Sequence, residues 1–513
     1  MQRHLITPSR LLFASAGLAL SGVLAFANPA AAQKNKEVTI VLIEELADAD
    51  VCNMSRSTVG RIVRHNIGET LTEINRKTGK LDPKLAKSWE RLNDSTWRFH
   101  LVENATFHDG EKFNAEAVVK GLNRTFHNPK LFCANKAKSR MPTVKGKVVD
   151  EFTVDISLDK PAPILPVRMN IIGIASPNAD QEKMENVTVG TGPYMMTNRK
   201  AGTSITLELD PNYWGKKPEV TKATFVYRSE SSVRAAMVQI GEADLAPNIA
   251  VQDAINSKTD FAFLNSETTR LRIEMNEAPL NDARVREALH YALDRDALQG
   301  SVFSKDALHA THLFEPAIQG YNKAIKNRPY DQAKARALIA AAKKDGVPVD
   351  KEIAIICRLN QWPGAQEGMQ AILAMYQDVG LNMKLRCLEQ AQHSDMNTKP
   401  FDSNRGPILF QDQHDNANSD PAFSAGTKYG CDGVQSTLCD KDFDAMSAAA
   451  SNLSPGSERI AAWEKAFTYL YTDVFADVTL FHMVGYTRVG SRISFIPSIE
   501  TNTSVTLANI SFN

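Results

Sequence analysis

One short stretch of the chain, residues 409–423 (LFQDQHDNANSDPAF), gathers side chains that bind metals, cations or protons. Asp412, His414 and Asp415 lie within it, Asn416 is one of several neighbouring amides, and no lysine or arginine is present. Four interpretations are open: a metal site, a pair of catalytic carboxylates, a clamp for a positively charged ligand, or a plain polar loop.

The sequence argues against a calcium site and gives no support for a pair of catalytic carboxylates. A calcium loop of the EF-hand type needs acids at alternating positions, a central glycine and a later glutamate, and the stretch lacks that order. Two carboxylates can hydrolyse a bond when they are suitably separated, but the sequence does not set their distance. Ligand contact and a plain polar loop both stay open, and we favour ligand contact for Asp412, His414, Asp415 and Asn416. We expect Asp420, which precedes a proline, to shape a turn.

Other motifs that could carry catalysis are weak. His309, His312 and Glu315 lie in HATHLFE, but no H-E-x-x-H, G-x-S-x-G or Walker A sequence occurs, and VGTGPY lacks the third glycine of a dinucleotide-binding loop. The two histidines are expected in the core or in solvent. We predict no metal, no cofactor and no catalytic residue, hence a protein that is not an enzyme.

A β-α-β unit is predicted to position a further pair of candidate residues. Its strands are 352–357 and 382–389, and an amphipathic helix over 365–380 joins them. Two strands joined by one crossover helix normally lie parallel, and ligands bind beyond their carboxyl ends. Arg358 and Trp362 follow the first strand, so we expect both to line a crevice. The acidic stretch follows a third strand, PILF, and is expected as a loop at the same edge.

The rest of the chain mixes strands and helices, as in an α/β protein. The patterns predict three strands and three helices, with Asp282 as the N-cap of the last helix: strands over 37–46, 95–102 and from 204 to the proline at 211, and helices over 57–71, 114–126 and 282–298. Tyr213 and Trp214 are expected to pack, and Arg56, Arg61 and Arg64 to lie on a solvated face.

The bulk composition narrows the class of protein. The 513 residues are 43% hydrophobic, enough for two or three domains with real cores. The 59 basic residues balance the 59 acidic ones, so no strongly basic face is indicated and nucleic acid is not an expected partner.

The N-terminus is typical of a secretory signal peptide. Arg3 and Arg10 precede an apolar run over 11–27, and Ala30 and Ala32 fit a cut after residue 32. A cut after residue 27 and an uncleaved membrane anchor are the alternatives. No second apolar run is long enough to span a bilayer, so we expect a soluble, periplasmic protein.

Export would place the six cysteines in an oxidising compartment. Six cysteines allow about fifteen pairings. Local spacing favours Cys431–Cys439, which flank a short polar loop, and Cys357–Cys387, which lie at similar depths in the two strands of the β-α-β unit. Cys52 and Cys133 remain. No C-x-x-C occurs, so neither structural zinc nor a thioredoxin-like site is expected.

Five blocks in fixed order carry a family resemblance. They begin with KLDPKLAKSWERLNDSTWRFHLVENATFHDGEKFNAEAVV and continue through VGTGPYMMT, LELDPNYWGKKPEVTKATF and AAMVQIGEADLA to MNEAPLNDARVREALHYALDRDAL. Together they resemble the periplasmic solute-binding proteins of peptide-type ABC importers, the family 5 group with dipeptide-, oligopeptide- and nickel-binding members. The likeness runs from about residue 38 to about residue 300, then more thinly to the C-terminus.

The resemblance implies a two-lobed α/β periplasmic binding protein fold with an additional α/β subdomain and a hinge between the lobes. Lobe I would comprise 33–80, 191–275 and 481–513, the subdomain 81–190, and lobe II 276–480. The ligand would bind between the lobes and drive closure. A monomer would then dock on the membrane subunits of an ABC permease.

The resemblance also implies roles for two residues. In dipeptide-binding relatives an arginine after a lobe II strand meets the ligand carboxylate, and Arg358 occupies the matching place. A guanidinium fork suits a carboxylate; an internal ion pair is the alternative. Asp415, or else Asp412, is nearest to the family's aspartate for the ligand ammonium. The usual tryptophan is missing there, and extra residues separate Phe401 from Asp420, so this segment departs from the family's spacing.

The favoured function is therefore a binding protein that delivers a small solute to an ABC importer. A short peptide or amino-acid derivative is the favoured ligand, and opines, sugars and metal chelates stay open. Two alternatives remain: a secreted hydrolase of a charged small molecule, and a sensor or chaperone on the same scaffold.

Overall fold

A computed structural model describes residues 36–46, 48–55, 57–75, 80–131, 133, 144–359, 361–362, 364–415 and 420–513. The predicted signal peptide, residues 1–32, and Arg56 lie outside the described residues.

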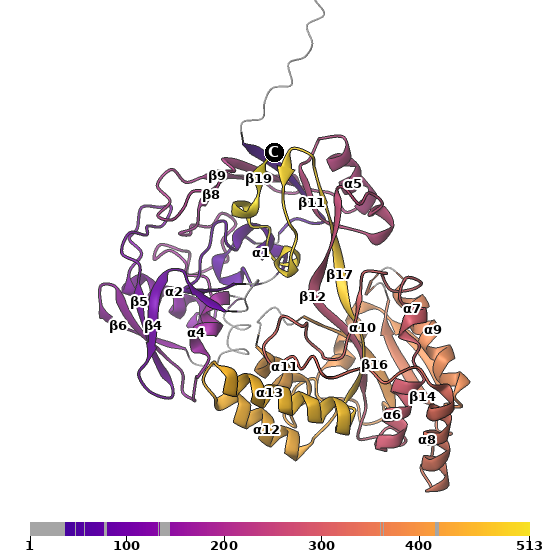
Figure 1. The fold of residues 1–513 in the computed structure, drawn as a ribbon. Coiled ribbons are helices and arrows are strands. Elements are labelled where there is room, and N and C mark those ends of the chain that lie inside the picture. Colours follow the sequence, from indigo (N-terminus) through magenta and orange to yellow (C-terminus); the bar gives the residue numbers. More distant parts are fainter. Residues whose placement is uncertain are drawn as a thin grey trace, which may run out of the picture. The chain divides into compact units, whose positions relative to one another are not determined.

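One large mixed sheet runs through most of the described chain (Figure 1). In sheet order its strands are β15 (Met383–Leu388), β14 (Ile353–Arg358), β16 (Ile408–Asp415), β12 (Asp260–Ile273), β17 (Asp477–Val489), β11 (Leu245–Ile249), β1 (Glu37–Leu42), β10 (Lys222–Tyr227), β9 (Ser204–Leu209) and β8 (Tyr194–Lys200), with β13 (Leu308–His309) beside β17. The long strands β12 and β17 pair antiparallel along their length. They connect the two halves of the sheet, which we call lobe I (β11 to β8) and lobe II (β15 to β16).

Lobe I packs its half of the sheet against short helices and the C-terminal tail. Its helices and remaining strands are η1 (Val51–Asn53), α1 (Ser57–Val63), α5 (Ser231–Gln239), η3 (Val251–Asp253), β18 (Ile493–Ser494), η5 (Ile499–Asn502), η6 (Leu507–Asn509) and β19 (Ser511–Phe512). The core joins Ile40, Tyr194 and Phe225 to Val505 and Leu507. Lobe I is thus completed by residues from both ends of the described chain.

The subdomain has a sheet and a core of its own. Its elements are β2 (Thr72–Ile74), β3 (Leu81–Pro83), β4 (Ala86–Arg91), β5 (Thr96–Leu101), α2 (Ala115–His127), β6 (Lys145–Asp150), β7 (Thr153–Ser157), α4 (Leu165–Arg168) and η2 (Met169–Ile171). The order β4-β5-β7-β6 forms a four-stranded antiparallel sheet among the described residues. Trp97, Phe99 and Leu101 alternate inward along β5, as the period of two predicts.

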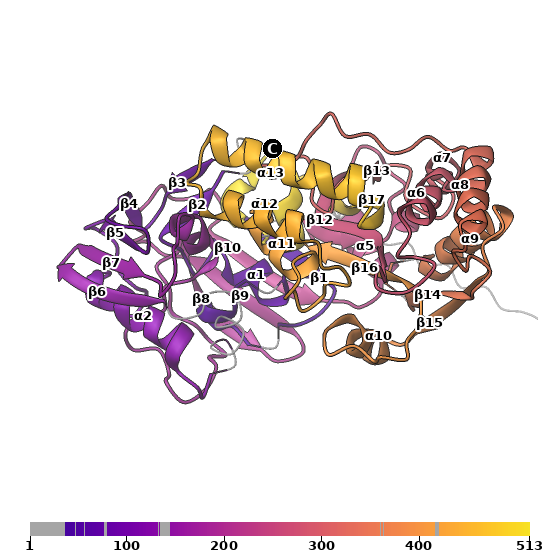
Figure 2. The ribbon, with the colours of Figure 1, turned by 90° about the horizontal axis from the view of Figure 1, so that it is seen from below.

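Lobe II contains the predicted β-α-β unit. Strand β14, helix α9 (Ala365–Asp378) and β15 follow in order, and the two strands pair in parallel as neighbours. The other helices are α6 (Ala283–Tyr291), α7 (Arg295–Leu298), α8 (Gln332–Lys344), α10 (Gln390–Asn397), α11 (Pro421–Lys428), α12 (Lys441–Asn452), α13 (Ser457–Tyr469) and η4 (Leu470–Val474). Figure 2 shows α11, α12 and α13 together, apart from α6, α8 and α9. The predicted two-lobed α/β class is confirmed, while the residue boundaries of the lobes stay a prediction.

Three elements differ from their predicted bounds. The helix predicted over 57–71 ends at Val63, because His65 adopts a positive φ of 63°. The helix predicted over 282–298 is two helices, because Asp294 caps a new helix by accepting from the Ala297 N–H. Asp282 caps the first of the two, as predicted.

The third difference concerns the acidic stretch. The sequence predicts a loop, but β16 extends into the stretch as far as Asp415 and pairs antiparallel with β12, placing Asp412 opposite Arg270 and Asp415 opposite Glu267. The cross-strand partners hold the backbone in the sheet, so the polar sequence is an interior strand over its first half.

The six cysteines form three disulfides: Cys52–Cys133, Cys357–Cys387 and Cys431–Cys439. Cys357 and Cys387 are direct register partners on β14 and β15. The Cys52–Cys133 bond ties η1 of lobe I to the segment that follows α2 of the subdomain.

Candidate functional site

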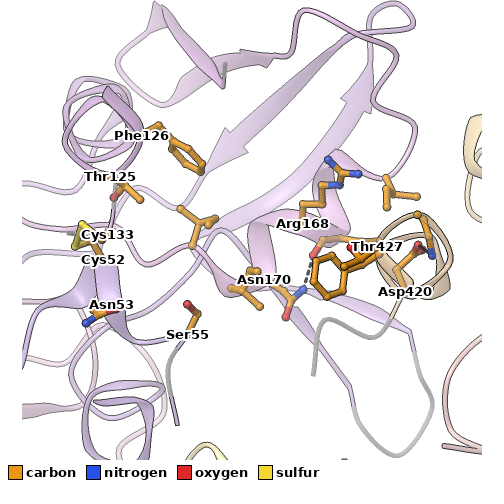
Figure 3. Close-up of a pocket in the computed structure, with 17 residues that line it drawn as sticks. Cys52, Asn53, Ser55, Thr125, Phe126, Cys133, Arg168, Asn170, Asp420 and Thr427 are labelled. Atoms are coloured by element: carbon orange, nitrogen blue, oxygen red, sulfur yellow. Dashed lines mark hydrogen bonds between the residues drawn. A yellow bond between two sulfur atoms is a disulfide. The ribbon is translucent and has the colours of Figure 1, made fainter. Parts of the chain in front are cut away.

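A pocket of about 250 Å³ lies between the subdomain and helix α11 of lobe II (Figure 3). Figure 3 shows the Cys52–Cys133 disulfide on one side of it, and Arg168, Asp420 and Thr427 on the other. Its described lining is mainly apolar, with a few amides, hydroxyls and two charges: Cys52, Asn53, Ser55, Thr125, Phe126, Cys133, Ile164, Val167, Arg168, Asn170, Ile171, Ile172, Asp420, Ala422, Phe423, Gly426 and Thr427.

Helix α11 forms the lobe II wall of this pocket. Asp420 is its N-cap and accepts from the Ala422 N–H at 2.9 Å, in keeping with the turn-forming role predicted for it. The same carboxylate accepts two hydrogen bonds from Arg459, each 3.0 Å long. Asp420 is therefore neutralised from its own lobe.

Asp412 lies in the interior of lobe II, on the side of α11 that faces away from the pocket. Its side chain is 5% exposed and accepts from Lys428 at 2.8 Å and from Arg270 at 3.2 Å. Arg270 also donates to Asp477 at 2.6 Å. Burial alone would raise the pKa of Asp412, but Lys428 and Arg270 hold it well below its usual value. Burial lowers the pKa of Lys428 to about 8, against the opposing effect of Asp412.

His414 supports the same helix. It is 3% exposed, and its Nε2 lies 2.7 Å from the Ser424 hydroxyl. Burial, followed by the charges of Lys428 and Arg270, holds the pKa of His414 well below its usual value, so the ring is neutral. Asp412 and His414 thus fix α11 to β16, and α11 presents Phe423 to the pocket.

Two other predicted contacts are only partly described. Asp415 is the last residue of β16, and the structure describes its backbone alone. Asn416 lies outside the described residues.

Arg358 ends β14 and is half-buried. Its backbone N–H donates to the Gln411 Oε1 at 3.0 Å, and its guanidinium donates to Gln390 at 3.1 Å. Among the described residues no carboxylate lies within salt-bridge distance of it, so the internal ion pair considered above is not formed in that part of the chain. The guanidinium keeps donors for an anion.

Trp362 packs in the core of lobe II. It is 8% exposed, and its ring stacks on Phe303 with the centroids 5.2 Å apart. Its neighbour Gln361 reaches β16 instead and donates to the Gln413 Oε1 at 2.5 Å, while Gln413 donates to Thr269. This amide pair was not singled out from the sequence, because glutamines near strand ends carry no distinctive signal.

The other arginines, aromatic residues and histidines singled out from the sequence are buried or half-buried wherever the structure describes them. Arg61 and Arg64 are buried, at 8% and 5% exposure, which corrects the expected solvated face. Tyr213 and Trp214 pack as predicted, donating to the buried Glu69 at 2.8 and 2.9 Å. His312 is a core residue, stacked 4.1 Å from Tyr321.

Arg168, Asn170 and Phe423 were not predicted as site residues. Arg168 and Asn170 come from PAPILPVRMN, a segment with no charge pattern or motif. Their position on the pocket wall depends on α4 and η2 lying opposite helix α11, an arrangement that no local spacing encodes.

Within the described residues, no group of three or more histidine, cysteine or acidic side chains is arranged to hold a metal ion. In the same part of the chain, no helix has both the length and the apolar content to cross a membrane.

Comparison with known proteins identifies the family. The model of the bacterial extracellular solute-binding proteins, family 5 Middle, matches residues 80–431. The dipeptide-binding protein of Escherichia coli is 26% identical over 455 residues, 81% of this chain and 84% of that protein. Heme-binding protein A of Haemophilus influenzae is 26% identical over 460 residues, 82% and 83% of the two chains.

A solved structure supports the same fold. HbpA2 from Haemophilus parasuis superimposes with a TM-score of 0.82 at 19% identity, covering 93% of this chain and 100% of that one. The chain belongs to the bacterial extracellular solute-binding proteins of family 5, the substrate-binding components of ABC importers.

Proposed function

We propose that this protein captures a short peptide or an amino-acid derivative between its two lobes and delivers it to the membrane subunits of an ABC permease. It performs no catalysis. It acts in the periplasm after removal of the signal peptide, and closure of the lobes about β12 and β17 commits the ligand to transport.

The observation that carries this proposal is the free anion-binding capacity of Arg358. The guanidinium ends a parallel strand, at the carboxyl edge where ligands of α/β sheets bind. Its described side-chain partner is the neutral Gln390. A ligand carboxylate would complete a bidentate pair there.

The ammonium group of the ligand is assigned to Asp415. Asp412 is the weaker candidate, because Lys428 and Arg270 already occupy its carboxylate. Asp415 stands three residues further along β16, where the strand ends. The predicted zwitterion clamp therefore uses Arg358 and Asp415, with Asp412 as a structural support for α11.

The relatives suggest the ligand class and also its breadth. The E. coli relative is named for dipeptides and the H. influenzae relative for heme. We place this protein with the first, because Arg358 and Asp415 suit a zwitterion.

A thermal-shift screen against dipeptides, tripeptides, opines, sugars and metal chelates tests the proposal. A ligand that binds the native state alone raises the apparent stability by mass action. We expect a response to zwitterionic peptides, accompanied by a smaller radius of gyration in solution scattering as the lobes close. Silence from every peptide, with no change in scattering, would refute the peptide assignment.

A further inference from the structure

Arg168 differs from the other arginines around the pocket. It is the last residue of α4 and is half-buried, and its guanidinium makes no hydrogen bond or ion pair with any described residue. Arg124 donates to both oxygens of Asp50 at 2.8 and 2.6 Å, and Arg459 donates to both oxygens of Asp420. The guanidiniums of Arg124 and Arg459 are thus each paired with a carboxylate inside the protein, whereas Arg168 has no such pair.

The charge balance of the described lining favours an anion. Asp420 is the one carboxylate among the described residues that line the pocket, and Arg459 and the α11 backbone already use its oxygens. Adding Arg168 leaves an excess positive charge at the wall. Burial lowers the pKa of Arg168, and Arg459 adds to this while Asp420 opposes it, so the cation is poorly compensated.

The remaining lining residues indicate the polarity and size of the ligand group that carries the anion. Phe126, Ile164, Ile171 and Phe423 supply apolar surface to the pocket. Pockets that bury a whole small molecule are usually about 300–1,000 Å³, and this one is about 250 Å³. The pocket therefore fits one arm of a ligand rather than an entire one.

We propose that this pocket is an anion subsite, in which Arg168 binds a carboxylate carried on an apolar arm of the transported solute. The inference rests on the proposed function and narrows it: the solute has an acidic group besides the groups that meet Arg358 and Asp415. The Arg168 guanidinium then donates charge-assisted hydrogen bonds to the carboxylate, and Phe126 and Phe423 contact the apolar arm.

A pair of fragments that differ in charge but scarcely in shape tests the subsite. Binding of 3-phenylpropionate and 3-phenylpropionamide is measured by ligand-observed NMR on the full mature chain. The wild type should prefer the acid at least tenfold, about 1.4 kcal/mol. Arg168→Gln should bind acid and amide equally. Arg168→Lys should keep part of the preference, because the charge remains but the planar fork is lost.

Arg336→Gln is the matched control. Arg336 is exposed on α8 and bonds to the Asp378 carbonyl and to Gln332, remote in sequence from every lining residue. Its loss should leave the preference for the acid unchanged. Equal binding of acid and amide by the wild type, no binding of either, or a preference that survives in Arg168→Gln would overturn the subsite. Should Arg168→Gln fail to fold, the wild-type preference and Arg168→Lys still decide.

A separate binding experiment with the dipeptide Ala-Phe distinguishes this inference from the proposed function. Ala-Phe tests the zwitterion clamp through Arg358 and carries no second acid. Acid-selective fragment binding without Ala-Phe binding would uphold the subsite and refute the dipeptide assignment. Ala-Phe binding without acid selectivity would do the reverse.

Discussion

The charged groups on the two sides of α11 differ in their partners: one side of the helix faces the interior of lobe II, and the other faces the pocket. On the interior side, Asp412, Lys428 and Arg270 are buried and bonded to one another. On the pocket side, Arg168 is half-buried with no described partner. The first group stabilises the wall and the second is available to a ligand. In this region the clustered charges of the sequence form the interior support of α11, and the proposed ligand contact is a charge outside that cluster.

The largest expected effect is a loss of stability when the buried ion pairs of Asp412 are removed. Asp412→Ala would leave Lys428 and Arg270 short of a countercharge, and breaking a buried pair typically costs about 3–5 kcal/mol. Urea unfolding should show this loss. Asp345→Ala is the control, because that carboxylate is 61% exposed beside Arg284 and such pairs contribute about 0–1 kcal/mol. Adding Lys428→Met to Asp412→Ala should restore part of the stability. Equal unfolding free energies for Asp412→Ala and Asp345→Ala would break the comparison.

The next effect is on affinity rather than stability. Arg358→Ala and Asp415→Ala should each weaken binding of a responsive peptide at least tenfold, since a charge-assisted contact contributes about 1.5–3 kcal/mol. Calorimetric titration measures the affinity, and urea unfolding should show stability close to the wild type for Arg358→Ala. Unchanged affinity in both variants would remove the zwitterion clamp.

The two sides of α11 should also differ in their response to pH: stability should depend on pH through the buried side, and ligand affinity at the pocket side should not. The unfolded chain protonates His414 below about pH 6.5, while burial and the neighbouring cations keep its folded pKa well below that value. The unfolded state then binds more protons, so the free energy of unfolding falls as pH falls, by up to ~2 kcal/mol at pH 5. His414→Gln should flatten this slope in urea titrations between pH 7 and 5. Fragment affinity at Arg168 should stay level between pH 8 and 6, because neither partner titrates there.

The smallest effect is expected for an arginine that is half-buried and already bonded to an exposed partner. Arg91 at the end of β4 donates to Ser454 in the loop between α12 and α13 at 3.0 Å, and also bonds to Asp94. Because exposed contacts of this kind contribute about 0.2–1 kcal/mol, Arg91→Ala should change peptide affinity by a few-fold at most. A loss as large as that of Arg358→Ala would make this contact part of the ligand-bound state.

Periodicity was enough to predict the β-α-β unit, because β14, α9 and β15 are local and strongly patterned. It was not enough for Asp412, whose environment comes from Arg270, 142 residues earlier, and from Lys428 on the next helix. The sequence of a polar stretch does not distinguish an acid in a loop from an acid in an ion-paired strand. Arg168 gave no signal, because what distinguishes it is the absence of a described partner, which only the packed structure reveals.

The C-terminal tail sets the order in which this molecule can be assembled. Asn66, just after α1, donates to the Val505 carbonyl at 2.8 Å and accepts from the Leu507 N–H at 2.9 Å, links that span 439 and 441 residues. Contacts so distant along the chain form slowly, because the intervening loop must close first. The core of lobe I therefore cannot close while the chain is still being synthesised. An exported chain built in this way crosses the membrane before its first lobe has a native interior, and its last residues complete the folding of its first.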